Sequence, residues 1–520
     1  AKSGPELKTL DLFKTGVPLA ASRSILPEMK HAVDMAIMEL RSSHPAPLDA
    51  EDAVSELVDL WVYFPVEIDE PGKAIRIAQI EFVSNRLMAE LGDHEELIRL
   101  FRSKFRARFG DHLSADRVDL VPGLTSEVRE MLKSIAQRGC EVEEVAPRWD
   151  LRLKMDPKLA AEGGVQAMDK IIKDGRNGRI VLLSSLVETQ LLADKRRIMV
   201  AKFIRVAKRF LSGAVNPDDA RWCNAQLDAN TLTPSEGVGP GGRVRLPTQA
   251  DATKMVLTVA MSRPGLPCKY SKHDVAEAFR LVWLAFCMCG LFAVSVPRWV
   301  LGLGHGHFYS ILLALSFGST ISPGFFDFYS KGISMAHASF CPPHPERNGA
   351  MGFQNLALVD DVVLIGVDEG LCLLWSSMVC LWCMRMMLGA AAANEEKGAI
   401  EAAWEPRKIV WGIGHDASTV HLDPLSLRLQ MTPVKRERAR TLVFDTRWDV
   451  GSLDFGRWQV QVISGNCVFW ASVARVMWPL MMSLAQVIHV LPDGPVGVAG
   501  QPTGELLKAY EEVWRVMELL

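Results

Sequence analysis

The stretch Ala357-Leu-Val-Asp360-Asp361-Val-Val-Leu-Ile365 places two adjacent carboxylates between two apolar runs. Apolar runs of this length on either side of a short polar point predict a β-hairpin with the aspartates at its tip. Adjacent carboxylates repel each other and lose hydration beside buried strands, and a divalent cation neutralises both. A solvated turn is the alternative, because Asp is a common turn residue. A second aspartate pair in the chain, Asp218-Asp219, is expected to form such a turn. The pair is therefore a candidate metal site.

The composition is that of a globular protein with several domains. A length of 520 residues predicts about three domains, and an apolar content of 49% is enough for a sizeable core. The chain has 58 basic and 61 acidic residues, a net charge of -3. This balance argues against a uniformly basic coat for nucleic acid, but it leaves room for a local basic groove.

The ten cysteines lack the spacing of a metal site or of a disulfide scaffold. Cys380-Leu-Trp-Cys383 lies in an apolar run without a second pair, so we favour core packing over zinc. His305-Gly-His307 could bind a metal, but two histidines in a glycine-rich loop are more often incidental, so we do not favour a metal site there. Without a disulfide scaffold or a signal-like apolar segment, we expect an intracellular protein of the cytoplasm or nucleus.

Two uncharged, mostly apolar runs, 281–297 and 371–384, raise the alternative of a membrane protein. A membrane-spanning helix needs about 20 apolar residues. Both runs are shorter, and they are bounded by Arg280, Arg298 and Arg385. Buried strands or helices explain them at least as well, so we expect no membrane partner.

Patterning along the chain predicts a mixed α+β fold. Residues 1–180 have mostly helical periodicity, without evident chemistry. From residue 246 onward, apolar runs alternate with short polar points. Strands are expected at 268–274, 291–296, 355–359 and 362–367, and helices at 275–283, 323–337, 369–388 and 430–442.

Three further segments accompany the aspartate pair. They are Lys272-His-Asp274-Val-Ala-Glu-Ala-Phe279, Ser316-Phe317-Gly318 with Ser322-Pro323, and Asn394-Glu-Glu-Lys397 followed by Trp411-Gly412-Ile413-Gly414. In this order, and with the aspartate pair in third place, they resemble the palm motifs of reverse transcriptases. The resemblance covers about residues 200–480 and is most similar to gypsy-like or DIRS-like retroelement enzymes.

The resemblance implies a right-hand polymerase fold and an RNA-directed DNA polymerase activity. It implies fingers at 181–267, a palm of antiparallel sheet and helices at 268–416, and a helical thumb at 417–520, after a helical region at 1–180. The implied partners are deoxynucleoside triphosphates and an RNA or DNA template with its primer. Two Mg²⁺ ions, with Mn²⁺ as the alternative, would activate the primer 3′-oxygen and stabilise the leaving pyrophosphate.

The resemblance also implies roles for single residues. Asp274 and Asp360 would be the main metal ligands, Asp361 would assist them, and Lys397 would lie near the pyrophosphate. The nucleotide would contact Phe279, Phe317 and Gly318, together with basic residues drawn from Arg205, Lys208, Arg209 and Arg221, of which we take Arg209 and Arg221. Residues Trp411, Gly412, Ile413 and Gly414 would hold the primer end. Core packing is the alternative for Phe279, and a solvated surface position is the alternative for Lys397.

One position departs from the family pattern. Leu358 stands two residues before the first aspartate of the pair, where the family usually has an aromatic residue. This departure motivates the alternative of a catalytically degenerate relative that only binds nucleic acid.

Overall fold

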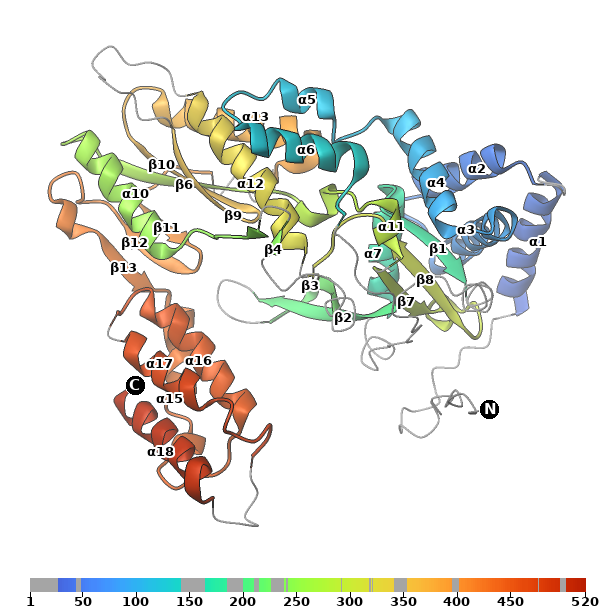
Figure 1. Ribbon diagram of the computed structural model, residues 1–520. Helices are drawn as coiled ribbons and strands as arrows, with labels where there is room; N and C mark the ends of the chain where they lie inside the picture. Colours follow the sequence, from blue (N-terminus) through green and yellow to red (C-terminus); the bar gives the residue numbers. More distant parts are fainter. Residues whose placement is uncertain are drawn as a thin grey trace.

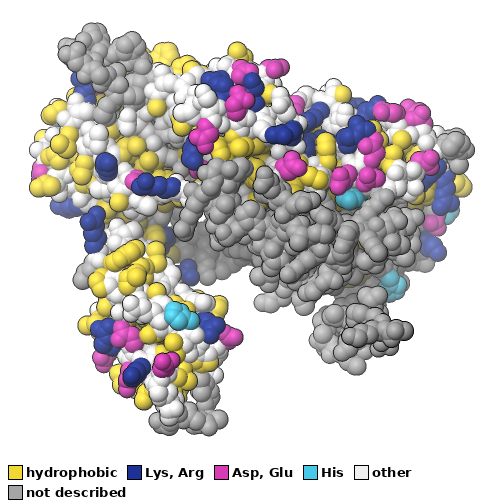
Figure 2. Space-filling model, in the orientation of Figure 1, with side chains coloured by type: hydrophobic (Ala, Val, Ile, Leu, Met, Phe, Trp, Pro, Cys, Tyr) yellow, Lys and Arg dark blue, Asp and Glu magenta, His cyan; other side chains and the backbone are white. Residues whose placement is uncertain are grey.

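The computed structural model describes residues 27–43, 48–141, 164–184, 200–209, 215–225, 238–239, 242–290, 292–317, 319, 321–340, 353–394, 402–475, 477–495 and 502–520. Helices and mostly antiparallel sheets are combined in one chain, which confirms the α+β class (Figure 1). On the face shown in Figure 2, basic and acidic side chains are interspersed. This face is therefore not a uniformly basic coat, as the near-neutral composition suggests.

The N-terminal part is helical, as the periodicity predicted. Three of its helices begin at an aspartate whose side chain accepts backbone N–H groups: Asp49, Asp69 and Asp93. The helices are α1 (Pro27–Ser43), α2 (Ala50–Val62), α3 (Glu70–Leu91), α4 (His94–Phe109), α5 (Ala115–Asp119), α6 (Ser126–Arg138) and α7 (Gly164–Arg176). Their apolar faces belong to the same core as the central part of the chain, so the N-terminal helices are not a separate globule.

A five-stranded sheet follows, in the order β1-β8-β7-β2-β3. Its strands are β1 (Ile180–Ser184), β2 (Val200–Arg209), β3 (Val215–Ala225), β7 (Ala293–Pro297) and β8 (His307–Leu312). The strand predicted at 291–296 is thus confirmed as β7. Asp218 and Asp219 lie within β3, beside a shift of register near Ala207 and Arg209, so their interpretation as a turn was wrong.

The aspartate pair belongs to a three-stranded antiparallel sheet in the order β6-β10-β9. The strands are β6 (Cys268–Asp274), β9 (Gln354–Leu358) and β10 (Asp361–Val367), close to the predicted bounds. Val362 and Leu364 of β10 join one core cluster, whereas Val363 and Ile365 join another. Because side chains of a strand alternate between its faces, this sheet is buried on both sides.

Helices cover both faces of this central sheet (Figure 1). Helices α12 (Ser322–Ser339) and α13 (Cys372–Leu388) pack against one face, and α10 (Gln249–Ser262) packs against the other. The helices predicted at 323–337 and 369–388 are confirmed as α12 and α13. Cys380 and Cys383 of α13 are buried in the core, as the core-packing interpretation predicted.

The prediction of a helix at 275–283 was wrong. Only a short 3-10 helix, η4 (Ala278–Leu281), forms there. Glu277 precedes it with a φ of 54°, in the left-handed region, which ends any helical run. Residues 282–284 are extended, because Leu315 N–H donates to Val282 O and Leu284 N–H donates to Leu313 O, both at 2.9 Å.

The C-terminal part combines a small sheet with a helical bundle. The sheet has the order β11-β12-β13, formed by β11 (Arg407–Val410), β12 (Ile413–Asp416) and β13 (Arg428–Met431). The helix predicted at 430–442 is α15 (Pro433–Val443), preceded by β13. With α16 (Arg457–Ala471), α17 (Met477–Val487) and α18 (Gly504–Leu519), it forms a bundle with its own hydrophobic core.

The two uncharged runs form ordinary parts of this fold. The run 281–297 contains the short helix α11 (Phe286–Cys289) and strand β7, and the run 371–384 lies mainly in α13. Among the described residues, no helix combines the length and the apolar character needed to span a bilayer.

Candidate active site

The aspartate pair lies at a tight hairpin, as the sequence predicted. Leu358 and Asp361 are cross-strand partners, so Val359 and Asp360 form a two-residue turn between β9 and β10. Val359 has a φ of 57°, whereas Asp360 is not among the positive-φ residues. A positive φ at the first central position alone is the pattern of a type II′ turn. Asp360 thus occupies the tip, and Asp361 begins β10.

Two hydrogen bonds fix this turn to its surroundings. The Ser330 hydroxyl, from α12, donates to Val359 O at 2.7 Å. The Val275 N–H donates to Asp360 O at 2.9 Å. A β-branched residue with a left-handed φ is strained, and such a conformation persists where its surroundings hold it in place.

Left-handed non-glycine residues mark three of the motif segments. Glu277, Val359 and Trp411 are the non-glycine residues with positive φ in the described part of the chain. They lie in the segments that contain Asp274, the aspartate pair and the predicted primer-holding hairpin. Strained backbone conformations of this kind cluster at functional sites, so the backbone singles out the same segments as the sequence.

Asp274 and Asp361 face each other across the sheet. They are directly opposite in the antiparallel ladder of β6 and β10, which places their side chains on the same face with Cβ atoms about 5 Å apart. Asp274 is 8% exposed. The Asn394 side-chain amide donates to its Oδ2 at 2.9 Å, and the Asn394 N–H donates to its backbone carbonyl at 3.2 Å. The structure therefore brings the first, third and fourth motif segments together.

These carboxylates suit a hard divalent cation in chemistry and number. In the described residues, no group of three or more His, Cys, Asp or Glu side chains is placed to hold a metal ion. Mg²⁺, however, is commonly held by one or two carboxylates together with substrate phosphates and water. Asp274 and Asp361 would supply such a pair, with Asp360 next to them at the tip. Lys397 and Gly318 lie outside the described residues.

Phe279 and Phe317, predicted from separate motifs, are in contact. Their ring centroids are 4.9 Å apart, and the Phe279 ring also meets Phe326 of α12 edge-on at 5.6 Å. Phe279 is 6% exposed and belongs to the main core, so the core-packing alternative describes part of its surroundings. The Ser322 hydroxyl donates to Ser316 O at 2.8 Å and closes the loop that carries Phe317.

The basic residues predicted to contact the nucleotide lie on a hairpin of the five-stranded sheet. Arg205, Lys208 and Arg209 are on β2, and Arg221 is on β3, where it pairs with Val206. Only the backbone of these strands is described. Their proposed contacts with a nucleotide therefore stay predictions.

Trp411 and Gly412 form the turn between β11 and β12. Both have positive φ, 46° and 85°, which is typical of a type I′ hairpin turn. Gln249 ties this hairpin to α10, which packs on the β6-β10-β9 sheet, because its amide donates to Val410 O at 2.8 Å and its carbonyl lies 2.7 Å from His415 Nε2. Burial lowers the pKa of His415 to about 4, so its ring is neutral at pH 7. Ile413 is fully buried.

The sequence did not reveal Lys435 as part of this hairpin region. Lys435, from α15, approaches Gly412 so closely that a Cβ at that position would clash with its ammonium group. Its ammonium group lies 3.6 Å from the centre of the Phe469 ring. Burial lowers the pKa of Lys435. No motif signalled this residue, because its place depends on packing between the small sheet and the C-terminal helices.

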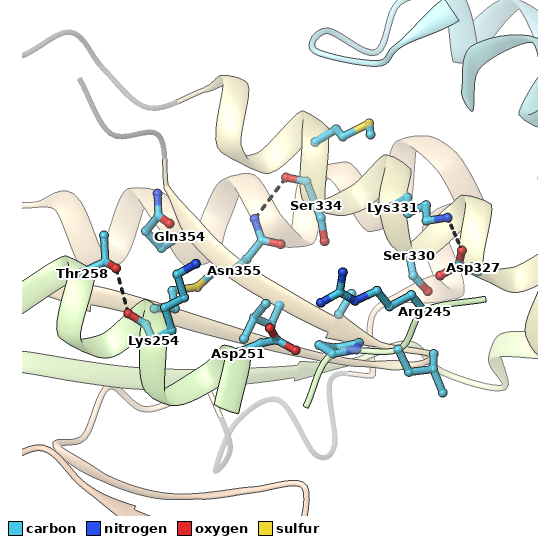
Figure 3. A pocket seen from close by; sticks show the side chains of 16 residues that line it. Arg245, Asp251, Lys254, Thr258, Asp327, Ser330, Lys331, Ser334, Gln354 and Asn355 are labelled. Atoms are coloured by element: carbon cyan, nitrogen blue, oxygen red, sulfur yellow. Dashed lines mark hydrogen bonds and ion pairs between the residues drawn. The ribbon is translucent and has the colours of Figure 1, made fainter. Parts of the chain in front are cut away.

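A groove of about 550 Å³ lies directly beside the aspartate hairpin (Figure 3). Helices α10 and α12 and strand β9 form it, and its lining reaches Ala357 and Ser330, next to the Val359 turn. Three exposed cations line it, namely Arg245, Lys254 and Lys331, of which Lys331 pairs with Asp327 at 2.6 Å. The composition leaves room for such a local basic groove, but no motif indicated its residues, because Lys331 joins Arg245 and Lys254 only when α12 packs beside α10.

The chain matches no model of a known protein family and no curated protein sequence. Among solved structures it is similar to a foamy viral protease-reverse transcriptase dRH in complex with double-stranded DNA, with 13% identity and a TM-score of 0.40, over 78% of this chain and 60% of that chain. It is also similar to a foamy viral protease-reverse transcriptase in complex with double-stranded DNA, with 12% identity and a TM-score of 0.40, over 78% of this chain and 71% of that chain. The chain thus spans 60% of the length of the first of these proteins.

Proposed function

We propose that this protein is an RNA-directed DNA polymerase of a retroelement, gypsy-like or DIRS-like, which extends a primer with deoxynucleotides. The observation that carries the proposal is the opposed pair Asp274 and Asp361, beside the strained Val359-Asp360 turn. Asn394 supports it, because its contact with Asp274 joins a further motif segment to the same place.

The carboxylates would hold two Mg²⁺ ions, with Mn²⁺ as the alternative. Bound there, the ions would lower the pKa of the primer 3′-hydroxyl and neutralise charge on the leaving pyrophosphate. In the reaction, the 3′-oxygen bonds to the α-phosphorus, the bond from that phosphorus to the bridging oxygen breaks, and the hydroxyl proton is released. Asp274 and Asp361 would position this centre from strands β6 and β10, whose sheet is buried on both faces, and Asp360 would do so from the turn beside them.

The remaining motif residues would bind the nucleotide and the primer. The Phe279 ring, packed on Phe317, would lie against the sugar and crowd its 2′-position, which favours deoxynucleotides. Gly318, Arg209 and Arg221 would contact the incoming nucleotide, and Lys397 would lie near the pyrophosphate. The hairpin from Trp411 to Gly414 would support the primer end.

The groove beside the hairpin would take the template with its primer. Phosphate backbones are bound mainly by Lys and Arg side chains. Arg245, Lys254 and Lys331 are exposed and line the groove, whose lining also includes Ala357 and Ser330 next to the aspartate turn. A duplex end placed there would bring a primer 3′-hydroxyl toward the carboxylates.

A degenerate relative that binds nucleic acid without catalysis is the second candidate. The observation that favours it is Leu358, which pairs with Asp361 at the base of the turn. An aromatic ring expected at this position would supply a broad flat contact near the primer, and a leucine side chain supplies less.

Primer extension on matched RNA and DNA templates separates these two functions. We expect the full-length protein to extend a primer on an RNA template with deoxynucleotides and Mg²⁺, and EDTA to abolish the product. Salt-sensitive binding of the same primer-template, without any product in Mg²⁺ or Mn²⁺, would overturn the polymerase proposal in favour of the degenerate relative.

A further inference from the structure

The segment that follows Asp274 and Phe279 is held by hydrogen bonds from the N-terminal region, from α4 and from the loops after α4 and α6; we call this set of contacts the clasp. Of the four consecutive carbonyls of residues 281–284, three accept hydrogen bonds from residues that precede the polymerase-like motifs. Cys140 N–H donates to Trp283 O at 2.8 Å, the Arg102 guanidinium donates to Leu284 O at 2.7 Å, and His112 Nε2 bonds to Leu281 O. The Ala285 N–H in turn donates to Cys140 O at 2.9 Å.

Arg102 is the centre of this clasp. It lies on α4 and is 2% exposed. Its guanidinium stacks near the rings of Trp283 and Phe286, at 4.8 and 5.1 Å from their centres. Burial lowers its pKa to about 10, so it keeps its charge at pH 7. In the part of the chain that the structure describes, no carboxylate forms an ion pair with Arg102, and the nearby Asp111 pairs with Arg106 instead, at 3.2 Å.

Burying a guanidinium without a paired carboxylate destabilises the folded state, because the charge loses its hydration. This cost is offset if the guanidinium serves to hold the Leu284 carbonyl and the rings of Trp283 and Phe286 in place. The His112 ring, 5.0 Å from Trp283, adds a second hold. A carbonyl oxygen only accepts hydrogen bonds, so His112 Nε2 carries the proton in this contact.

The clasped segment connects directly to the predicted nucleotide site. On its other side, residues 282–284 bond to residues 313–315, as Val282 and Leu284 do with Leu315 and Leu313. Phe317 follows two residues later and packs on Phe279, which precedes the clasped segment. The clasp therefore fixes the two chain segments that bring these rings together.

Ion pairs hold the start of the same segment. Glu277 pairs with Lys173 of α7 at 2.6 Å and with Arg179, and Arg280 pairs with the buried Asp174 at 3.0 Å. Burial alone would raise the pKa of Glu277, but the nearby cations outweigh it and hold this pKa well below its ordinary value. Glu277 therefore stays ionised, and residues 277–285 are anchored at both ends.

We propose that the N-terminal helical region is a positioning element of the nucleotide site, and that Arg102 is its main positioning residue. The proposal rests on the polymerase function proposed above. Arg102 acts through Trp283 and Leu284 on the contact between Phe279 and Phe317. Asp274 and Asp361 are held by the β6–β10 ladder, so loosening the clasp affects nucleotide binding more than the chemical step.

The test compares Arg102→Met with Arg99→Met in the full-length protein. Arg99 lies one turn earlier on α4, on the exposed surface, where it pairs with Glu96, so it is a matched control. We expect Arg102→Met to accelerate amide hydrogen exchange at Leu284 and Ala285 by about tenfold, because a hydrogen bond from a charged donor is lost. We expect Arg99→Met to exchange like the wild type.

Primer-extension kinetics give the second readout. For Arg102→Met we expect KM for deoxynucleotides to rise by about tenfold, kcat to fall by less than about threefold, and discrimination against ribonucleotides to weaken. A merely structural role would reduce the active fraction, and so kcat, without changing KM. Arg102→Lys keeps the charge and one donor, so we expect it to restore most of both properties. If the methionine variant does not fold, the same comparison is made between Arg102→Lys and Arg99→Lys, with smaller shifts in the same direction.

Two results would overturn the proposal. One is exchange at Leu284 and Ala285 in Arg102→Met that equals that of the control. The other is accelerated exchange with an unchanged nucleotide KM. If the wild type extends no primer at all, the polymerase proposal fails, whereas the exchange comparison, which needs no substrate, still decides whether Arg102 holds the segment.

Discussion

Asp274 and Asp361 are direct cross-strand partners at the end of the β6–β10 ladder, where the strained Val359-Asp360 turn also lies. Like charges in this position destabilise a sheet unless something offsets the repulsion. Under the proposed function, a divalent cation held between the two carboxylates, with substrate phosphates as further ligands, would offset this repulsion. The register of one strand pair would then connect the stability of the hairpin to metal binding.

Neutralising the three aspartates of the proposed site one at a time should lower the rate of primer extension. We expect Asp274→Asn and Asp360→Asn to lower the rate by on the order of 1,000-fold, because metal ligation supplies several kcal/mol of transition-state stabilisation. Asp361→Asn should have a smaller effect if this residue only assists. Asp368→Asn is the control, since Asp368 lies just beyond the other end of β10 and pairs with Lys269 at 2.5 Å. Full activity in Asp360→Asn, with unchanged circular dichroism, would remove the metal assignment.

The strained turn should respond to glycine differently from the strand beside it. Val359→Gly relieves a left-handed φ but loosens the unfolded chain, so the unfolding free energy should stay within about 1 kcal/mol of wild type. Val363→Gly, at a fully buried position of the same hairpin, should cost about 3 kcal/mol. Primer extension by Val359→Gly should fall by about tenfold, because the aspartates lose a rigid support. Chemical denaturation and steady-state rates measure both effects. Equal destabilisation by the two variants would show that Val359 carries no backbone strain.

Local patterns predicted the central hairpin, because burial and chemistry there are encoded in neighbouring residues. The alternation of Val362 to Ile365 between two cores follows from an uninterrupted apolar run in a sheet that is covered on both faces. The contact of Asn394 with Asp274 agrees with the order of the motifs. The turn conformation was not predictable from propensity, since a β-branched residue such as Val359 is disfavoured at positive φ.

Long-range contacts decided what the sequence did not predict. Residues 275–283 have a helical pattern, but hydrogen bonds from Cys140 and Leu315 draw the backbone of residues 282–283 into an extended conformation. The basic groove combines Arg245, Lys254 and Lys331, which are separated in sequence and lie outside the densest basic segment. Such sites exist only after the helices pack, so composition and spacing give no sign of them.

The pH dependence of the unfolding free energy should depend on His112, the buried histidine of the clasp. Burial lowers the pKa of His112 to about 4, below its ordinary value of about 6.5 in the unfolded chain. Between these values the unfolded state binds a proton that the folded state does not, so stability is lost as pH falls from about 6.5 to about 4. His112→Gln removes this share, up to about 3 kcal/mol, and keeps an N–H donor for Leu281 O. Unfolding free energies at pH 7 and pH 4.5 measure the effect.

The control for this experiment is His305→Gln, at an exposed position in the loop before β8. We expect it to keep the wild-type pH profile, including the contributions of the other buried histidines, whose pKa values burial also lowers to about 4: His273, His337 and His415. If His112→Gln kept the full wild-type loss of stability between pH 7 and pH 4.5, the ring would not be held neutral by burial.

Substitutions in the groove should weaken nucleic-acid binding in a salt-dependent way. Arg245 and Lys254 are exposed and line the groove beside the aspartate turn (Figure 3). If each contacts a phosphate of a duplex, Arg245→Gln or Lys254→Gln should reduce the slope of log affinity against log salt by about 0.9. Fluorescence anisotropy with a labelled primer-template at several salt concentrations measures this slope. Lys133→Gln is the control, because Lys133 lies on α6 and pairs with Asp119 at 3.0 Å. If Lys254→Gln and Lys133→Gln gave the same slope as the wild type, the phosphate backbone would not follow this groove, and the duplex would have to reach the carboxylates from another side of the sheet.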